Sequence, residues 1–226
     1  MSRPCLLKAE EIKVPMTIVA SPPESRVVIR NLSWETYETL LRERGDEGPR
    51  MAFDRGILEV MSPSSKHETL KKIIARLVEV FCEELEIDAR DTGSTTFRSQ
   101  LKERGLEPDE SYYIQNEARV RGKEIDLTAD PPPDLAIEID LRQSSLNKLG
   151  IYAALGIPEV WSHDGKQVVV HLLQPSGEFT ASDQSAALPK LNIADLSDFV
   201  GRIGSDSNTR IVRAFRRWVQ EKFGTR

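Results

Sequence analysis

The chain has 226 residues, of which 39% are hydrophobic and 30% charged, and its formal net charge at pH 7 is -5. This length is sufficient for one main domain with a sizeable core, and no apolar run approaches the ~18 residues that a membrane span needs. The negative charge argues against a surface that grips nucleic acid through bulk charge alone, although local basic patches remain compatible with it.

The amino-terminal segment and the cysteines both point to a reducing compartment. The first apolar stretch is very short and is followed by Glu10 and Glu11, which is not the pattern of a secretion signal. Cys5 and Cys82 cannot form a disulfide framework, and Cys82 falls on the apolar side of a predicted helix, where a buried reduced thiol is typical. We therefore expect a cytoplasmic protein with no membrane partner.

The first elements in chain order are a strand, a helix and a hairpin. A short strand is predicted at 26–29, and a helix runs from Trp34 to about Glu43 with Gly45 as its stop. Residues 51–53 and 57–61 flank an Asp-Arg-Gly turn, which predicts a β-hairpin.

The strongest helix of the sequence begins near Ser65. Its apolar residues recur every three or four positions, as the buried face of a helix requires: Leu70, Ile73, Ile74, Leu77, Val78, Phe81 and Leu85. Further strands are predicted at 94–98, 110–114, 124–128, 134–141, 159–163 and 167–173, and further helices at 146–155 and 208–223.

This order of helices and strands predicts an α/β fold in which a mixed β-sheet is flanked by helices. The polar, turn-rich segment 175–189 is expected to be a surface excursion. We expect an N-terminal extension over 1–32, a core over 33–173, and a C-terminal loop and helical extension over 174–226 that packs on the core.

The predicted strand at 134–141 places acids and apolar residues at alternate positions. Side chains of a strand alternate between its faces, so Asp134, Ala136, Glu138 and Asp140 share one face and four apolar residues share the other. Neighbouring carboxylates repel one another, and their oxygens are the preferred ligands of hard cations such as Mg²⁺. The pattern suggests a bound divalent cation, whereas an ordinary half-buried strand with a solvated acidic face is the alternative.

Three further residues complete a plausible catalytic constellation with Glu138. Asp109 stands at the start of a predicted strand, Glu68 in the first turn of the strongest helix, and Lys148 near the start of the helix after the acidic strand. Acids and a lysine that converge in this way would form a metal-dependent phosphodiesterase site.

Each of these residues also fits a simpler structural role. Ser65 and Glu68 match a capping box, and Asp109 after a proline matches turn chemistry. Asp134 could simply begin a strand, and His67 could be an exposed residue or a neighbour of a helix cap. Lys148 could be a plain surface charge on a helix.

Several motifs together resemble the Uma-two family of restriction endonucleases, a branch of the PD-(D/E)XK nuclease superfamily. The motifs are Met61-Ser62-Pro63 followed by His67-Glu68, Pro108-Asp109, Pro133-Asp134-Leu135-Ala136-Ile137-Glu138, Lys148, Tyr152 and Gly156-Ile157-Pro158-Glu159-Val160-Trp161. The resemblance covers about residues 33–173, and the Gly-Ile-Pro-Glu-Val-Trp segment is its most specific part.

The resemblance implies a restriction-endonuclease-like fold and a set of site residues. Asp109 and Glu138 would hold Mg²⁺ or Mn²⁺, with the backbone carbonyl of Ile139 as a third ligand. Glu68 would be a supporting acid, and Lys148 would take the part of the superfamily's lysine.

Asp140 is a departure from the superfamily pattern, because it stands where the lysine of the Glu-x-Lys motif is expected. A lysine on the following helix is thought to substitute in this branch, and Lys148 lies where it should. Asp140 is a further candidate metal ligand, or a source of hydrogen bonds around the ligands.

The expected activity is hydrolysis of DNA phosphodiester bonds by a magnesium-dependent endonuclease. Cutting both strands would favour a homodimer. An inactive nuclease fold that serves as a binding or oligomerisation scaffold is the alternative, favoured by the negative net charge and by Asp140. Candidate residues for a DNA-binding groove are Lys71, Lys72, Arg76, Arg98 and Lys102.

Overall fold

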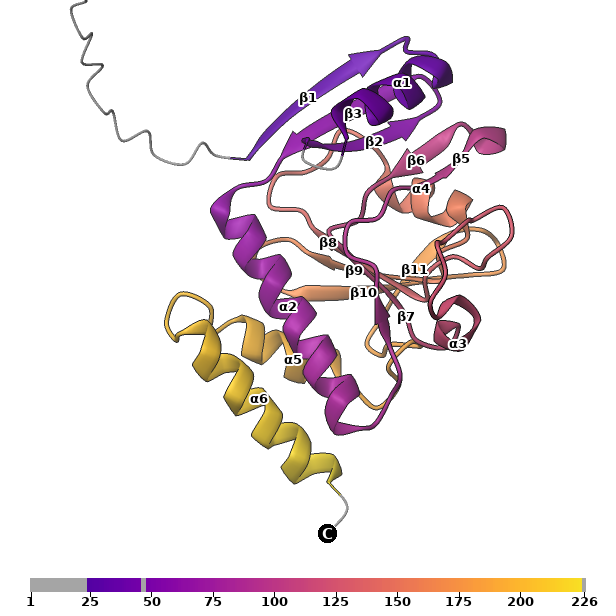
Figure 1. The fold of residues 1–226 in the computed structure, drawn as a ribbon. Helices are drawn as coiled ribbons and strands as arrows, with labels where there is room; N and C mark the ends of the chain where they lie inside the picture. Colours follow the sequence, from indigo (N-terminus) through magenta and orange to yellow (C-terminus); the bar gives the residue numbers. More distant parts are fainter. Residues whose placement is uncertain (1–23, 46–47, 225–226) are drawn as a thin grey trace, which may run out of the picture.

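Two β-sheets and the helices packed on them make up the fold (Figure 1). The structure is a computed structural model and describes residues 24–45 and 48–224. The five-stranded sheet has the order β1-β3-β2-β6-β5, and the six-stranded sheet has the order β11-β10-β9-β8-β7-β4. The expected N-terminal extension is described only from residue 24, and Cys5 lies outside the described residues.

The five-stranded sheet is antiparallel at each of its pairings. The helix α1 (Trp34–Arg44) packs its aromatic side on this sheet, where Tyr37 stacks on Phe53 with ring centroids 4.8 Å apart. The hairpin turn places both Arg55 and Gly56 at positive φ, the geometry that a two-residue turn needs to follow the twist of its strands. The strands are β1 (Ser25–Arg30), β2 (Arg50–Asp54), β3 (Ile57–Ser62), β5 (Phe97–Ser99) and β6 (Arg104–Leu106).

The six-stranded sheet is mixed, as the sequence predicts. The strands β8 and β9 pair in parallel, whereas the other neighbouring strands pair antiparallel. The whole of β8 is buried, so the alternative of a half-buried strand with a solvated acidic face is wrong. The strands are β4 (Arg90–Asp91), β7 (Glu110–Tyr113), β8 (Leu135–Ile139), β9 (Glu159–His163), β10 (Val168–Leu173) and β11 (Phe179–Ser182).

Three helices form a layer beside the six-stranded sheet. The helix α2 contacts β8, and both α5 and α6 pack against α2 (Figure 1). Phe215 of α6 is fully buried there, with its ring centroid 5.1 Å from that of Phe199 and 5.3 Å from that of Trp218. The longer helices are α2 (Ser65–Glu84), α4 (Lys148–Leu155), α5 (Ile193–Val200) and α6 (Asn208–Phe223), and the short ones are η1 (Gln100–Lys102) and α3 (Glu117–Val120).

The cap of α2 differs from the expected capping box. Ser64 is the N-cap, and its hydroxyl accepts a hydrogen bond from the backbone N–H of His67 at 3.2 Å. Glu68 instead faces Arg50 and Lys71, whose side-chain nitrogens lie 3.1 and 3.2 Å from its carboxylate. With the cap shifted by one residue, Glu68 pairs with Lys71 of its own helix and with Arg50 of β2.

The sequence prediction fails mainly in the irregular segments. The strand expected at 124–128 is absent, because the carboxylate of Asp126 accepts hydrogen bonds from the backbone and hydroxyl of Thr128 and so favours a turn. The surface excursion at 175–189 contains β11 and ends in the buried Ala187 and Leu188. The helix α5 was not predicted.

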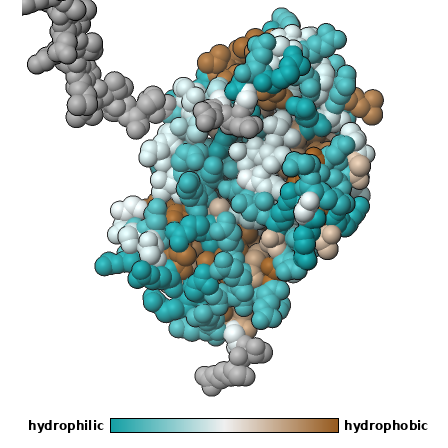
Figure 2. Space-filling view, viewed as in Figure 1, coloured by the Kyte–Doolittle hydropathy of each residue, from teal (hydrophilic) through white to brown (hydrophobic). Residues whose placement is uncertain are grey.

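The outer surface agrees with an ordinary polar exterior. Hydrophilic residues dominate the face shown in Figure 2. Within residues 24–45 and 48–224, no helix combines the length and the apolar character needed to cross a membrane.

The packing of α6 on α2 gives a direct test of the fold. Phe215→Ala should lower the free energy of unfolding by about 3–5 kcal/mol, because it removes a fully buried ring from the centre of this layer. Urea unfolding measures the change. The exposed Arg213 on the same helix gives the control, and Arg213→Ala should stay within about 0.5 kcal/mol of wild type. Equal stability of the two variants would contradict the packing described above.

Candidate active site

Glu138 lies at the centre of the candidate site, on the buried strand β8. Its side chain is 4% exposed, and both carboxylate oxygens accept hydrogen bonds. Lys148 Nζ donates to Oε2 at 2.6 Å, and the hydroxyl of Tyr152 donates to Oε1 at 2.7 Å. Lys148 and Tyr152 are four residues apart on α4, so they lie one above the other on the same helix face.

The sequence prediction that Lys148 meets Glu138 is therefore matched by the geometry. The helix α4 begins at Lys148 because Asn147 caps it, its side chain accepting from the backbone N–H of Gly150. Burial and the neighbouring Glu138 raise the pKa of Tyr152 well above its ordinary value, which keeps the phenol protonated as a donor. Lys148 also supplies the positive charge that the buried carboxylate of Glu138 requires, because an unpaired buried charge is strongly destabilising.

Asp109 is anchored to β8 directly beside Glu138. Its carboxylate Oδ2 accepts a hydrogen bond from the backbone N–H of Ile139 at 2.6 Å, and its own N–H donates to the carbonyl of Ile137 at 3.1 Å. The side chain is 1% exposed. Asp109 immediately precedes β7, the antiparallel neighbour of β8, so its carboxylate is bonded to the residue that follows Glu138.

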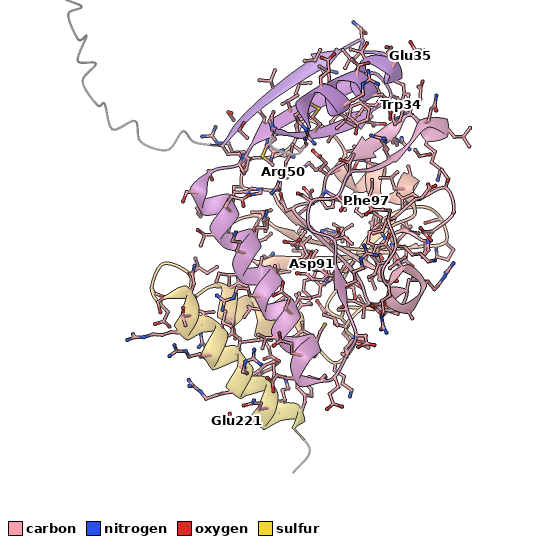
Figure 3. The ribbon with its side chains drawn as sticks, in the orientation of Figure 1. Trp34, Glu35, Arg50, Asp91, Phe97 and Glu221 are labelled. Carbon is pink, nitrogen blue, oxygen red and sulfur yellow. The ribbon has the colours of Figure 1, made fainter. Side chains whose placement is uncertain are left out.

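Arg50 is the residue at this site that sequence reasoning missed. It opens β2 and is labelled in Figure 3. Its guanidinium forms ion pairs with Oδ1 of Asp109 and, at 3.1 Å, with Glu68. A basic residue that begins an otherwise apolar strand was the available signal, but it does not reveal which acids the strand will meet. Arg50 joins the five-stranded sheet to the acids of the six-stranded sheet.

His67 neighbours the helix cap, as the sequence alternative suggested, because its N–H donates to Ser64, but its side chain is fully buried rather than exposed. Its Nε2 lies 3.1 Å from Oδ2 of Asp109. Burial and, next, the charge of Arg50 lower the pKa of His67 to about 4. The imidazole is therefore neutral at pH 7, and the positive charge that compensates Asp109 comes from Arg50.

Asp140 pairs with a residue of the other sheet rather than with the groups around Glu138. Its carboxylate forms an ion pair with Arg26 of β1 at 3.0 Å, and Arg26 also binds Glu59 of β3 at 2.8 Å. Glu59 in turn accepts hydrogen bonds from the backbone N–H of Ser145 at 2.9 Å and from the hydroxyl of Ser144. This network, absent from the sequence prediction, holds the loop that leads into α4.

Asp134 has the structural role that its position at the start of a strand suggested. Its carboxylate accepts hydrogen bonds from the backbone N–H groups of Ile114 and Asn116 at 2.7 and 2.9 Å, and from the side-chain amide of Asn116 at 2.6 Å. These bonds fix the turn after β7. Asp134 takes no part in the group around Glu138.

The expected DNA-binding residues divide between two places. Lys71, Lys72 and Arg76 lie on α2, and Lys71 is close to the site through its ion pair with Glu68. Arg98 on β5 pairs with Glu38 at 3.2 Å, and Lys102 in η1 donates to the carbonyl of Ala154.

The donor chemistry of this site fits a hard divalent cation. Asp109 and Glu138 offer carboxylate oxygens, and Oδ1 of Asp109 is buried with an ion-pair partner but no hydrogen bond. No group of three or more His, Cys, Asp or Glu side chains arranged for a metal occurs in the described part of the chain. Asp109 and Glu138 thus contribute two carboxylates of the type that a hard cation prefers, and both are already bound by basic side chains of the chain, Arg50 and Lys148.

Comparison with known proteins gives one family and a structural relative. Residues 34–202 match the model of the Uma2 family, described as "putative restriction endonuclease". A crystal structure from Anabaena variabilis, titled as a "putative nuclease belonging to DUF820", superposes with a TM-score of 0.51. The two sequences are 18% identical, and the match covers 75% of this chain and 99% of that one. No curated protein matches the chain.

The neutral buried imidazole of His67 predicts a specific pH dependence. Its pKa of about 4 lies below the ordinary histidine pKa of 6.5, so the unfolded chain binds the proton first as the pH falls. Wild type should therefore lose up to about 3 kcal/mol of stability relative to His67→Gln between pH 6.5 and pH 4. Denaturant unfolding of both proteins at each pH measures this difference.

Comparing the two proteins removes other titrations from the result. Burial and Asp91 raise the pKa of Glu110 to about 7, which lowers stability as the pH rises towards 7, but this effect is common to both proteins. A stability difference that stays constant from pH 7 to pH 4 would contradict a neutral imidazole at position 67.

Proposed function

Because the chain belongs to the Uma2 family, we propose that it is a divalent-metal-dependent endonuclease that hydrolyses phosphodiester bonds in DNA. The observation that supports this proposal most strongly is the buried Glu138, which is bonded to Lys148 and is next in sequence to Ile139, whose N–H donates to Asp109. A carboxylate pair with an adjacent lysine serves phosphoryl chemistry, because the acids bind a cation and the lysine meets developing negative charge.

Asp109 and Glu138 would hold Mg²⁺ or Mn²⁺, with the carbonyl of Ile139 as a third ligand. A cation there would lower the pKa of a bound water and neutralise charge on the scissile phosphate. Lys148 would orient the attacking water or stabilise the added charge on phosphorus. In-line attack then expels the ribose oxygen as the leaving group.

The residues around the two acids would set their orientation. Tyr152 remains protonated and directs one oxygen of Glu138 by its hydrogen bond. The N–H of Ile139 does the same for Asp109. Glu68, a sequence-predicted acid of the site, pairs with Lys71 and with Arg50, which also pairs with Asp109, so its part would be to position Arg50.

A second candidate function is a binding or oligomerisation scaffold without catalysis. The ion pair between Arg50 and Asp109 favours it, because this carboxylate already has a cationic partner within the chain. Absence of metal binding at Asp109 and Glu138 would support the scaffold. The expected homodimer belongs to the nuclease proposal, since cutting both strands is natural for a two-fold pair.

Glu138→Gln tests the nuclease directly. The substitution keeps the size of the side chain but removes its charge, so cleavage of supercoiled plasmid with Mg²⁺ or Mn²⁺ should fall by roughly 100-fold or more. Asp109→Asn and Lys148→Met should have similar effects. Calorimetric titration of Mn²⁺ should show weaker binding to the two carboxylate variants.

The exposed Glu178 provides the matched control, and Glu178→Gln should cleave DNA and bind Mn²⁺ as wild type does. Thermal unfolding establishes that each variant is folded. If folded Glu138→Gln cleaves DNA at the wild-type rate, the proposed catalytic role is wrong.

Tyr152→Phe tests the positioning of Glu138. It removes one hydrogen bond to the carboxylate while keeping the ring, and should lower Mn²⁺ affinity or cleavage rate by about 10- to 100-fold. A structural role alone would lower the unfolding temperature without changing Mn²⁺ affinity. Measuring both quantities on the same protein separates the two explanations.

A further inference from the structure

A cleft of about 460 Å³ borders the candidate active site at Arg50. Hydroxyl-bearing residues of the segment between β4 and β5 make up much of its lining: Thr92, Ser94, Thr95 and Thr96. Ser94 and Thr95 are exposed. The hydroxyls of the three threonines already bond within the chain, to Ser111, to the carbonyl of Thr92 and to Glu107. The exposed Ser94 and Arg50 are therefore the groups on which phosphate binding depends, since hydroxyl and guanidinium groups are common donors to the phosphates of DNA.

The acid in this lining, Glu107, is fully engaged. Arg44 binds it through two hydrogen bonds of 2.5 and 2.7 Å, and the backbone N–H of Met51 and the hydroxyl of Thr96 each donate to it at 2.9 Å. Its negative charge is therefore compensated within the chain, so that it does not prevent an anion from entering the cleft.

Arg50 is part of both the cleft and the candidate active site. Its guanidinium lines the cleft and also pairs with Asp109 and Glu68 of the candidate site, and its side chain is 13% exposed. A cation bound by Asp109 would compete with the guanidinium, because two positive charges at one buried carboxylate repel each other. Glu68 would still hold Arg50 at the edge of the cleft.

We propose that the cleft binds a backbone phosphate of DNA and that Arg50 moves its charge from Asp109 to that phosphate when Asp109 binds a divalent cation. This inference rests on the proposed function and adds a coupling between its two ligands. Such coupling is reciprocal: the cation strengthens DNA binding, and DNA strengthens cation binding. Arg50 is then a phosphate-binding residue rather than a permanent structural partner of Asp109.

The test measures binding apart from cleavage. Fluorescence anisotropy of a short labelled DNA duplex gives the affinity in chelator and in Ca²⁺, and a gel establishes that the duplex stays intact. Calorimetry gives the Mn²⁺ affinity without DNA. For wild type, Ca²⁺ should increase DNA affinity by about 5- to 150-fold, the usual range of coupling between sites.

Arg50→Met should change the two affinities in opposite ways. Mn²⁺ should bind more tightly, because the competing guanidinium is gone, whereas the gain in DNA affinity on adding Ca²⁺ should fall to below about one third of the wild-type gain. The exposed Arg213 on α6 gives a control with the same change of charge, and Arg213→Met should behave as wild type in both measurements. Unchanged coupling in Arg50→Met, or unchanged Mn²⁺ affinity, would overturn the proposal.

A variant of the cleft keeps the test decisive if Arg50→Met does not fold. Ser94→Asp adds a negative charge at an exposed position of the lining, so it should weaken DNA binding several-fold and leave Mn²⁺ affinity unchanged. Ser176→Asp, at an exposed position in the turn before β11, adds the same charge elsewhere and should have a smaller effect on DNA. Equal effects of the two would show that the cleft does not receive the phosphate.

The outcomes also separate this inference from the nuclease proposal. Intact coupling that depends on Arg50, without cleavage in any divalent cation, would overturn the nuclease and keep the inference. Cleavage that requires Glu138, together with DNA binding that is independent of Ca²⁺ in wild type, would support the nuclease and overturn the inference about Arg50.

Discussion

The burial of negative charge along β8 is the constraint on which the arrangement of this protein depends. Asp109 and Glu138 are almost entirely removed from water, and an uncompensated buried charge is strongly destabilising. The chain answers with Arg50 for the first acid and Lys148 for the second, supplied by β2 and α4. Two distant segments are in this way drawn to one strand of the six-stranded sheet.

Regular periodicity made a large part of the fold predictable from sequence. The helix at Ser65–Glu84 and the hairpin at 50–62 follow from local patterns, and both occur as expected. The strand expected at 124–128 fails because the side chain of Asp126 bonds its own backbone neighbourhood. Only the tertiary structure shows that β8 is buried on both faces, because its alternating sequence is equally typical of a half-exposed strand.

The acids of the candidate site were predictable, and most of their partners were not. Asp109, Glu138 and Lys148 stand out through residue type and order, and the geometry brings the three to the same strand. No local signal identifies the partners of Arg50 and Glu59, because the importance of these residues comes from pairing between segments far apart in sequence. His67 was ambiguous for the same reason: a helix start explains its position but not its complete burial.

The ion pairs of Arg26 reach from β1 in one sheet to Asp140 at the end of β8 in the other. Together with Arg50 of β2, they bring charged groups of the five-stranded sheet to the acids of the other sheet. The candidate site consequently lies between the two sheets and depends on residues of both. Neither sheet carries all of these groups. A fragment with one sheet alone would lack the positive charges that compensate its buried carboxylates. The two sheets are therefore expected to evolve together and to unfold together.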